Sequence, residues 1–195
     1  MIHVRCLAAT LAAALVAVSL TGCWSGHRPE SGRIVVSATG RIGPLRVDES
    51  ARADVISFAG RPESERRGRY VDFPPFDALG YSCRGKRATD EAGIPQCKTV
   101  FYLDSRSGEL ELLYTEDNRY VDVHGVHAGT RTPAAERQLH KRAFEGCFSG
   151  FRFETRTGFL VMWLEGGKKL VGDHVGFLVV HSKSLNPGVL DCIDS

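Results

Sequence analysis

The sequence has no excess of charge of either sign. Its 25 Lys and Arg residues stand against 23 Asp and Glu residues, which leaves a formal net charge of +2 at pH 7. Proteins that bind nucleic acid through a basic face need a strongly positive domain. The two basic runs, Arg66-Arg67-Gly68-Arg69 and Arg84-Gly85-Lys86-Arg87, lie in turn-like stretches that contain glycine, so we expect solvated loops there. The composition therefore argues against nucleic acid as a partner.

The sequence also lacks the motifs that mark common catalytic sites. No Gly-x-Ser-x-Gly nucleophile elbow occurs, so a hydrolase triad has no support. Gly166-Gly167-Lys168-Lys169 places lysines after glycines but lacks the rest of a P-loop. No Cys-x-x-Cys pair occurs, which removes the spacing of a zinc site or a thioredoxin-like redox site. We expect no catalysis and no cofactor, and a hydrolase with an unrecognised site is the less favoured alternative.

Long hydrophobic runs are absent after residue 20, but one run occupies the N-terminus. Cys6–Leu20 follows the positive charge of Arg5 and contains no charged residue. This run is shorter than the roughly 20 apolar residues that a helix needs to cross a bilayer. A short basic region followed by such a run is typical of a secretory signal peptide. We therefore predict that residues 1–22 are a signal peptide that is removed.

The four residues that end this run, Leu20-Thr21-Gly22-Cys23, resemble the lipobox of bacterial lipoproteins. The resemblance implies cleavage before Cys23 and attachment of diacylglycerol to its thiolate. Two acyl chains satisfy the requirement for stable membrane attachment, which one chain does not meet. We expect the protein on the outer face of the cytoplasmic membrane, or on the outer membrane if the host has one. The alternative is an ordinary signal peptide in which Cys23 is incidental.

A polar, turn-rich stretch at residues 23–32 is predicted to be a flexible tether. The cysteines that remain after it are Cys83, Cys97, Cys147 and Cys192. An even number of cysteines in an exported chain indicates disulfides. Of the three pairings, we favour Cys83–Cys97 and Cys147–Cys192, because each pair then lies within its own structural unit.

Two segments at an offset of 82 residues show the same order of signals. Each presents a hydroxyl residue, Ser50 or Thr132, that is predicted to cap a helix, and an acid in the first turn. Strand-like runs follow each helix, at Tyr70–Phe73, Leu79–Cys83, Lys98–Leu103 and Glu109–Tyr114, and then at Cys147–Thr155, Phe159–Glu165 and Val175–Val180. The pattern predicts an α+β fold with two repeated units, residues 33–120 and 121–195. Each unit is expected to be a helix packed on a three- or four-stranded antiparallel sheet.

This repeated order resembles a superfamily of small domains. It contains the SmpA/OmlA lipoprotein of the outer-membrane β-barrel assembly machinery and the tandem-repeat β-lactamase inhibitor proteins. The matching residues are Gly129-Thr130-Arg131-Thr132 before Glu136, and Ser50 through Asp54-Val55 to Gly60-Arg61-Pro62. The resemblance implies the two-unit architecture and non-catalytic binding. We therefore expect an envelope lipoprotein that contacts the membrane through Cys23 and binds another protein or an envelope component.

Histidine is the one residue type with a grouping that suggests a metal. His124 and His127 flank Gly125-Val126, and His174 and His181 bracket the last predicted strand. Two histidines with a nearby acid, such as Asp122 or Asp173, match the ligands of transition metals. The alternative is that these histidines are surface residues. Metal binding through His124 and His127 therefore stays open as a second hypothesis.

Overall fold

The structure is a computed structural model that describes residues 32–68, 74–84, 96–144, 149–165 and 172–185. The predicted signal peptide, the lipidation site Cys23 and the tether as far as residue 31 lie outside the described residues. The predicted strand Tyr70–Phe73, Cys147 and Cys192 also lie outside them. Within the described part, no helix is both long and apolar enough to cross a membrane.

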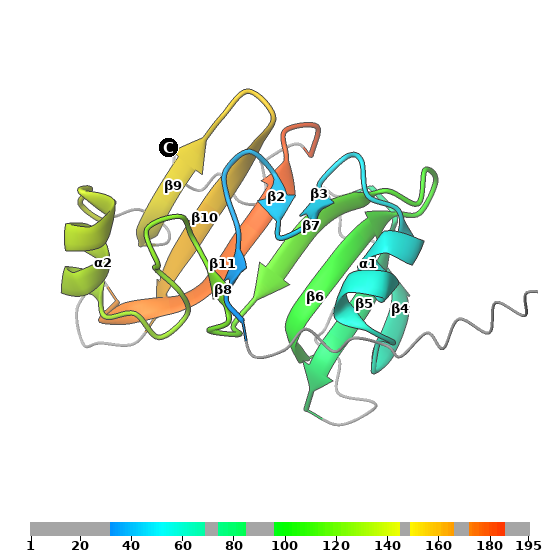
Figure 1. Cartoon of the computed structure of the whole chain (residues 1–195), viewed down its shortest axis with the longest axis horizontal. Coiled ribbons are helices and arrows are strands. Elements are labelled where there is room, and N and C mark those ends of the chain that lie inside the picture. Colours follow the sequence, from blue (N-terminus) through cyan, green and yellow to red (C-terminus); the bar gives the residue numbers. More distant parts are fainter. Residues whose placement is uncertain (1–31, 69–73, 85–95, 145–148, 166–171, 186–195) are drawn as a thin grey trace, which may run out of the picture.

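A seven-stranded antiparallel sheet dominates the molecule (Figure 1). Across the sheet the order is β4 (Ser64–Gly68), β5 (Phe76–Cys83), β6 (Cys97–Asp104), β7 (Leu110–Thr115), β11 (His174–Ser182), β10 (Gly158–Glu165) and β9 (Gly150–Glu154). Strands β4 to β7 form one meander, and strands β9 to β11 form another. Apart from the strand that falls outside the described residues, the strand-like runs predicted in both halves coincide with these strands to within a few residues.

The turn between β6 and β7 shows how the local sequence sets a hairpin. The carboxylate of Asp104 accepts hydrogen bonds from the amides of Arg106 (2.5 Å) and Ser107 (3.0 Å). Gly108 then adopts φ +76°, a conformation that glycine takes without steric cost. Residues 104–108 therefore form a hairpin loop that fixes the register of β6 against β7.

The two meanders join through β7 and β11, where Val179 pairs with Tyr114 and Val180 pairs with Leu113. One hydrophobic cluster extends across this junction, from Leu79 and Phe101 to Phe151. The prediction of an α+β fold made of two repeated helix-on-sheet units is therefore wrong. An unpaired strand edge exposes backbone donors and acceptors, so the inner edges of the two meanders pair and form a single sheet. The expected boundary between residues 120 and 121 falls inside a strand, β8 (Tyr120–Val121).

Both predicted helices exist, as α1 (Arg52–Ala59) and α2 (Thr132–Leu139), but their predicted caps are wrong. Ala51 occupies the N-cap of α1, and its amide donates to the carboxylate of Asp54 at 2.8 Å. Ser50 instead accepts a hydrogen bond from the amide of Arg46. Thr132 is the first residue of α2, and its buried hydroxyl donates to the carbonyl of Gly172 at 2.7 Å. Ser50 thus binds the end of β3, four residues before it, and Thr132 binds a residue 40 positions further along the chain.

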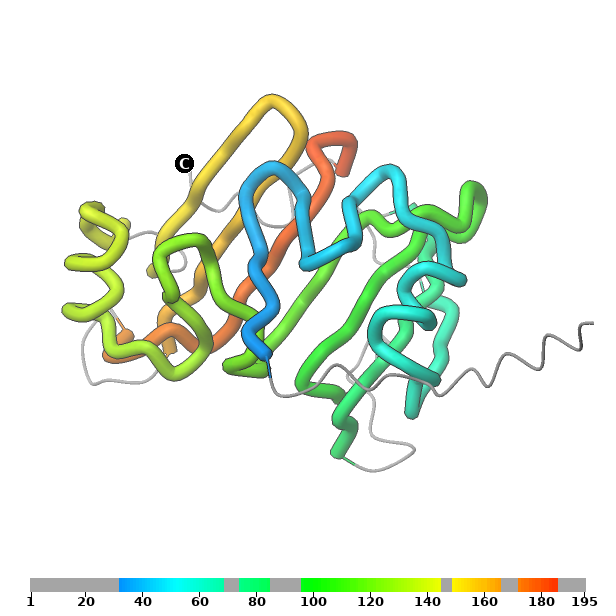
Figure 2. Tube along the Cα trace, in the orientation of Figure 1, coloured from blue at the N-terminus to red at the C-terminus, as the bar shows by residue number. Residues whose placement is uncertain are grey.

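A small second layer covers one face of the large sheet. Its strands are β1 (Ile34–Val35), β8, β2 (Arg41–Ile42) and β3 (Leu45–Arg46). β1 runs parallel to β8, and an isolated bridge between Val36 and Ile42 links it to the β2–β3 hairpin. Figure 2 shows this N-terminal segment crossing in front of the sheet. Val36 and Ile42 of this segment are fully buried in the main hydrophobic cluster, so the first residues of the domain form part of its core.

Strand β4 was not foreseen, because the run Arg66-Arg67-Gly68-Arg69 was interpreted as a solvated loop. Residues 66–68 of this run belong to β4, which is the edge strand of the sheet. The guanidinium of Arg67 donates to Asp77 of β5 at 3.0 Å. Charged side chains on an edge strand oppose pairing with another chain. The expectation of solvent exposure is met at Arg66 and Arg67, but the expectation of a loop is not.

Candidate ligand-binding cleft

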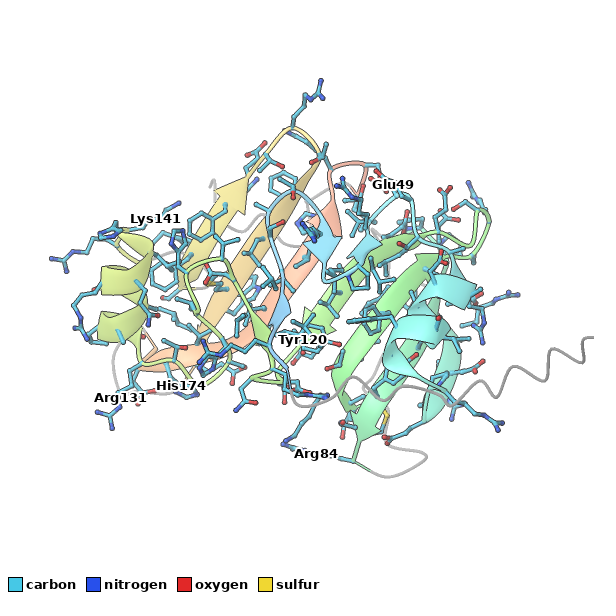
Figure 3. All side chains as sticks on the ribbon, viewed as in Figure 1. Glu49, Arg84, Tyr120, Arg131, Lys141 and His174 are labelled. Carbon is cyan, nitrogen blue, oxygen red and sulfur yellow. A yellow bond between two sulfur atoms is a disulfide. The ribbon has the colours of Figure 1, made fainter. Side chains whose placement is uncertain are left out.

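A cleft of about 510 Å³ opens where the second layer, α1 and the large sheet meet. It is lined by residues from five segments of the chain: Ile34, Phe58, Ala59, Gly60, Arg61, Glu63, Tyr81, Ser82, Thr99, Arg119 and Tyr120. Figure 3 labels Tyr120 where the N-terminal segment passes in front of the sheet. The lining combines aromatic rings with charged and hydroxyl groups, which is the composition of sites that orient a polar ligand.

Tyr81 joins the sheet to the end of α1 at the wall of the cleft. Its ring packs edge-to-face on Phe101, with ring centroids 5.7 Å apart. Its hydroxyl donates to the carbonyl of Gly60 at 3.1 Å, just after the last helical residue. Burial raises the pKa of Tyr81 to about 12, and the positive charge of Arg52 opposes that rise. Tyr81 therefore stays protonated at neutral pH and fixes the position of the helix end.

Glu63 places its carboxylate against two consecutive backbone amides at the end of β5. The amide of Ser82 donates to Oε1 at 3.1 Å, and the amide of Cys83 donates to Oε2 at 2.9 Å. Ser82 adopts φ +55°, which turns the two amides in the same direction. Successive amides around a left-handed residue form a concavity that binds anions. In this structure the carboxylate of Glu63 is the anion at that position.

The disulfide between Cys83 and Cys97 closes the same corner. It links β5 to β6 at positions that face each other in the register of the two strands. This is the pairing that the sequence favours for these two cysteines. A crosslink here limits how far the amides of Ser82 and Cys83 can move apart from β6.

Arg119 is held at the cleft by Asp117. Its Nε donates to the carboxylate at 2.9 Å and its Nη2 at 2.6 Å. Burial alone raises the pKa of Asp117, but the hydrogen bonds and charge of Arg119, with the charge of Lys98, outweigh that effect and lower it. The pair fixes the guanidinium plane. Among the described residues, Nη1 of Arg119 has no hydrogen-bond acceptor.

Tyr120 contributes a buried polar side chain to the cleft, with 4% of its surface exposed. Burial raises the pKa of its hydroxyl, and Arg119, Asp117 and Tyr81 contribute smaller electrostatic effects. Within the described chain, that hydroxyl makes no hydrogen bond. The oxygen is not fully shielded from solvent, so the hydroxyl can donate to a ligand acceptor in the cleft.

The histidines proposed as metal ligands take part in local structure. The carboxylate of Asp122 accepts hydrogen bonds from the amides of His124 (2.9 Å) and Val126 (2.8 Å), so it builds the turn between them. Nδ1 of His127 lies 2.7 Å from the carbonyl oxygen of Ala128. No group of three or more His, Cys, Asp or Glu residues that could hold a metal occurs in the part of the chain that the structure describes.

The other two histidines, His174 and His181, differ in how far they are buried. His174 pairs through Nδ1 with the carboxylate of Asp173, and both are solvent-accessible. His181 is 1% exposed, and its ring stacks on Phe159 with centroids 4.7 Å apart. His181 is therefore a core residue, whereas His174 belongs to the surface.

Sequence reasoning missed the cleft, because its residues share no motif. Glu63, Tyr81 and Tyr120 come from distant segments, and the pairing of β1 with β8 brings the last of them to the site. Arg119, the last residue of a polar run before the pair Tyr120-Val121, carries no signal of a binding site. The sequence indicates each strand but not which residues the strands bring together.

The similarity of this chain to known proteins is low. No protein-family model matches the sequence. No curated protein matches it either. Among solved structures, the chain is similar to a DUF4309 family protein (YjgB) from Bacillus subtilis, at 14% sequence identity and a TM-score of 0.42. The similarity covers 73% of this chain and 84% of that one. A similarity at this level does not establish a shared fold.

Proposed function

We propose that this protein is a bacterial envelope lipoprotein, anchored through lipid on Cys23, that binds an envelope component without catalysis. The observation that carries the anchor is the order Leu20-Thr21-Gly22-Cys23 at the end of the N-terminal hydrophobic run. The thiolate of Cys23 is the nucleophile for the diacylglyceryl group, and small residues before it give the peptidase access to the bond. The mature domain then lies outside the cytoplasm, on the cytoplasmic or the outer membrane.

The cleft supports the binding part of the proposal. Its volume of about 510 Å³ lies within the range of small-molecule sites, which runs from roughly 300 to 1,000 Å³. The exposed guanidinium of Arg61, the remaining donor of Arg119 and the hydroxyl of Tyr120 supply directional contacts. Phe58 and Ile34 supply apolar contacts beside them. Such a site recognises a ligand that has both a polar group and an apolar part.

Mass spectrometry of the mature protein from a bacterial membrane tests the anchor. We expect an N-terminal peptide that begins at Cys23 and carries acyl chains. The variant Cys23→Ser should accumulate as an unprocessed precursor, whereas Ser25→Ala, two residues beyond the cleavage site, should be processed normally. A mature N-terminus elsewhere, or Cys23 without lipid, would show that the proposal is wrong.

A further inference from the structure

The cleft already holds one oxyanion of its own. The carboxylate of Glu63 accepts hydrogen bonds from the amides of Ser82 and Cys83, at 3.1 and 2.9 Å. This arrangement shows that the backbone at this corner is oriented to donate to an anion. It also means that the negative charge of Glu63 is engaged and is not the group that meets a ligand.

Three further donors face the same cleft. Arg61 is exposed and forms no ion pair within the described residues. Arg119 keeps Nη1 after its contacts with Asp117, and Tyr120 keeps its hydroxyl. The hydroxyl stays protonated because burial raises its pKa, so it donates at neutral pH. Both acids at the site, Glu63 and Asp117, have partners, and the groups that remain are donors.

Guanidinium groups bind phosphate through two parallel hydrogen bonds, and a hydroxyl donor adds a third contact. A ligand with a carboxylate, which has two oxygens, would satisfy fewer of these donors than a ligand with a tetrahedral phosphate. The apolar side of the cleft, at Ile34 and Phe58, suits the carbon atoms next to such a phosphate. The donor set therefore fits a phosphate ester that carries an apolar part.

The position of the cleft identifies the source of that ester. Ile34 lines the cleft and lies eleven positions after Cys23 in the sequence. A chain of that length spans at most about 40 Å, even when it is fully extended. The lipid on Cys23 therefore keeps the cleft close to the headgroups of the membrane, where phosphate esters of lipids are concentrated.

We propose that the cleft binds the phosphate of an anionic phospholipid headgroup in the membrane that holds the chain. This inference rests on the proposed lipid anchor. Arg61 and the Nη1 donor of Arg119 contact the phosphate oxygens, and Tyr120 donates to a third oxygen. Binding then orients the domain with α1 and β1 toward the membrane and leaves α2 facing away from it.

Amide hydrogen exchange on the mature lipidated protein tests this orientation. The protein is reconstituted in nanodiscs of phosphatidylcholine, with or without phosphatidylglycerol. We expect the amides of Ile34, Ser82 and Tyr120 to exchange about tenfold more slowly when the phosphatidylglycerol concentration is about ten times its Kd. Inorganic phosphate, added to nanodiscs of phosphatidylcholine alone, is the second arm and distinguishes a lipid headgroup from a free anion.

Tyr120→Phe is the sharpest variant, because it removes the hydroxyl and keeps the ring. Together with Arg61→Ala, it should abolish the slower exchange and leave the melting temperature in phosphatidylcholine unchanged. The double variant Arg137→Ala/Arg142→Ala, on exposed cations of α2 and the turn after it, is the matched control and should respond to phosphatidylglycerol like the parent.

Three outcomes would overturn the inference. Equal slowing in nanodiscs with and without phosphatidylglycerol means that the cleft does not bind the anionic headgroup. Protection by inorganic phosphate alone, with none from phosphatidylglycerol, identifies a free anion as the ligand. If the slower exchange is lost equally in the α2 control and in the Tyr120→Phe/Arg61→Ala variant, the effect is a general attraction of cations to the membrane. Absence of lipid on Cys23 in the same preparation is a separate result, and it contradicts the proposed anchor without reference to the cleft.

Discussion

The two ends of the sheet follow the same order of elements, a helix and then antiparallel strands, but they present different chemistry. At the α1 end, the charged side chains of Glu63, Asp117 and Arg119 have partners and line or support a cleft. At the α2 end, Arg142 is 92% exposed and meets Glu136 only at 3.8 Å. Figure 3 labels Arg131 and Lys141 at this second end.

The difference arises from the N-terminal layer. β1 and β8 pair in front of the first meander and place Ile34 and Tyr120 as walls beside α1. Neither residue lines the shallower hollow beside α2, which is formed by residues of the helix and the turn after it. The comparison teaches that a repeated order of elements does not create repeated sites. A segment from outside the repeat decides which end becomes a cleft.

The largest expected effect tests whether the two ends share one core. Val55 of α1 and Ala135 of α2 are both fully buried. Replacing either residue by Asp buries an unpaired carboxylate, which should lower the free energy of unfolding by about 4 kcal/mol or more. Because the two meanders form one sheet, each variant should shift the same single transition in a chemical denaturation followed by circular dichroism.

Glu49→Ala is the control for this pair, because Glu49 is exposed and its contact with Arg46 spans 4.0 Å. We expect a change below about 0.5 kcal/mol. Two separate transitions, with Val55→Asp moving one and Ala135→Asp the other, would contradict the single sheet and restore two independent units.

The sequence predicted the helices and most strands because their signals are local. The alternation in Phe151-Arg152-Phe153-Glu154 and the turn at Asp104–Gly108 act over a few residues. The pairing of Leu113 with Val180 joins residues far apart in the sequence, and no short pattern encodes it. The same limit explains the wrong caps, since the hydroxyl of Thr132 binds Gly172 from a distant loop.

The candidate site was less predictable than the fold. Cys83 and Cys97 were expected to pair because they lie in the same predicted unit, but the role of Glu63 depends on the left-handed conformation of Ser82. A serine in that conformation is uncommon, and nothing in the sequence around it demands one. Tyr120 is part of an apolar pair that reads as core, and only its position beside Arg119 makes its hydroxyl a donor to a ligand.

The second prediction concerns the crosslink at the cleft end. The cysteines are separated by 14 positions, and a disulfide that closes a loop of this size contributes about 3 kcal/mol in the chain-entropy model. We expect the double variant Cys83→Ser/Cys97→Ser to lose a stability of that order in urea denaturation. It should also speed amide exchange at Ser82 more than at Val180, which lies in the other meander.

A reducing agent provides the control for this prediction. With dithiothreitol, amide exchange at Ser82 in the parent should rise to the rate seen in the double variant, and exchange at Ser82 in the variant should not respond. Equal stability of parent and double variant would contradict the proposed role of the disulfide at the corner that holds Glu63.

The third prediction uses Glu111, which lies at an irregularity of β7 where the register with β6 shifts. Burial, together with the smaller effect of the negative charges of Asp104, Asp48 and Glu109, raises the pKa of Glu111 to about 7. A carboxyl whose folded pKa exceeds its unfolded value binds protons more readily when folded. Stability should therefore fall as the pH rises from about 4.5 to about 7, and the full penalty should remain above pH 7.

Glu111→Gln should remove this slope and stabilise the protein at pH 8 by about 1 kcal/mol, a value that allows for solvent screening of a half-exposed group. Thermal unfolding at a series of pH values measures it. Glu49→Gln, which changes an exposed acid, should keep the dependence of stability on pH that the parent shows. A slope that survives in Glu111→Gln would assign the pH dependence to other carboxyls.

The smallest expected effect concerns His124 and His127, which lie in the segment that leads to α2. Asp122 binds the backbone of this turn, so the hydrogen bonds that its carboxylate accepts remain when both histidines become Ala, and only the half-buried contact of His127 with Ala128 is lost. We expect a change in the free energy of unfolding below about 0.5 kcal/mol. Metal analysis of the purified protein decides between this outcome and the second hypothesis. One equivalent of zinc or nickel, lost in the double variant together with several degrees of melting temperature, would establish a metal site beside α2. The α2 end would then carry a ligand site of its own, and the contrast with the α1 end would be one of ligand chemistry.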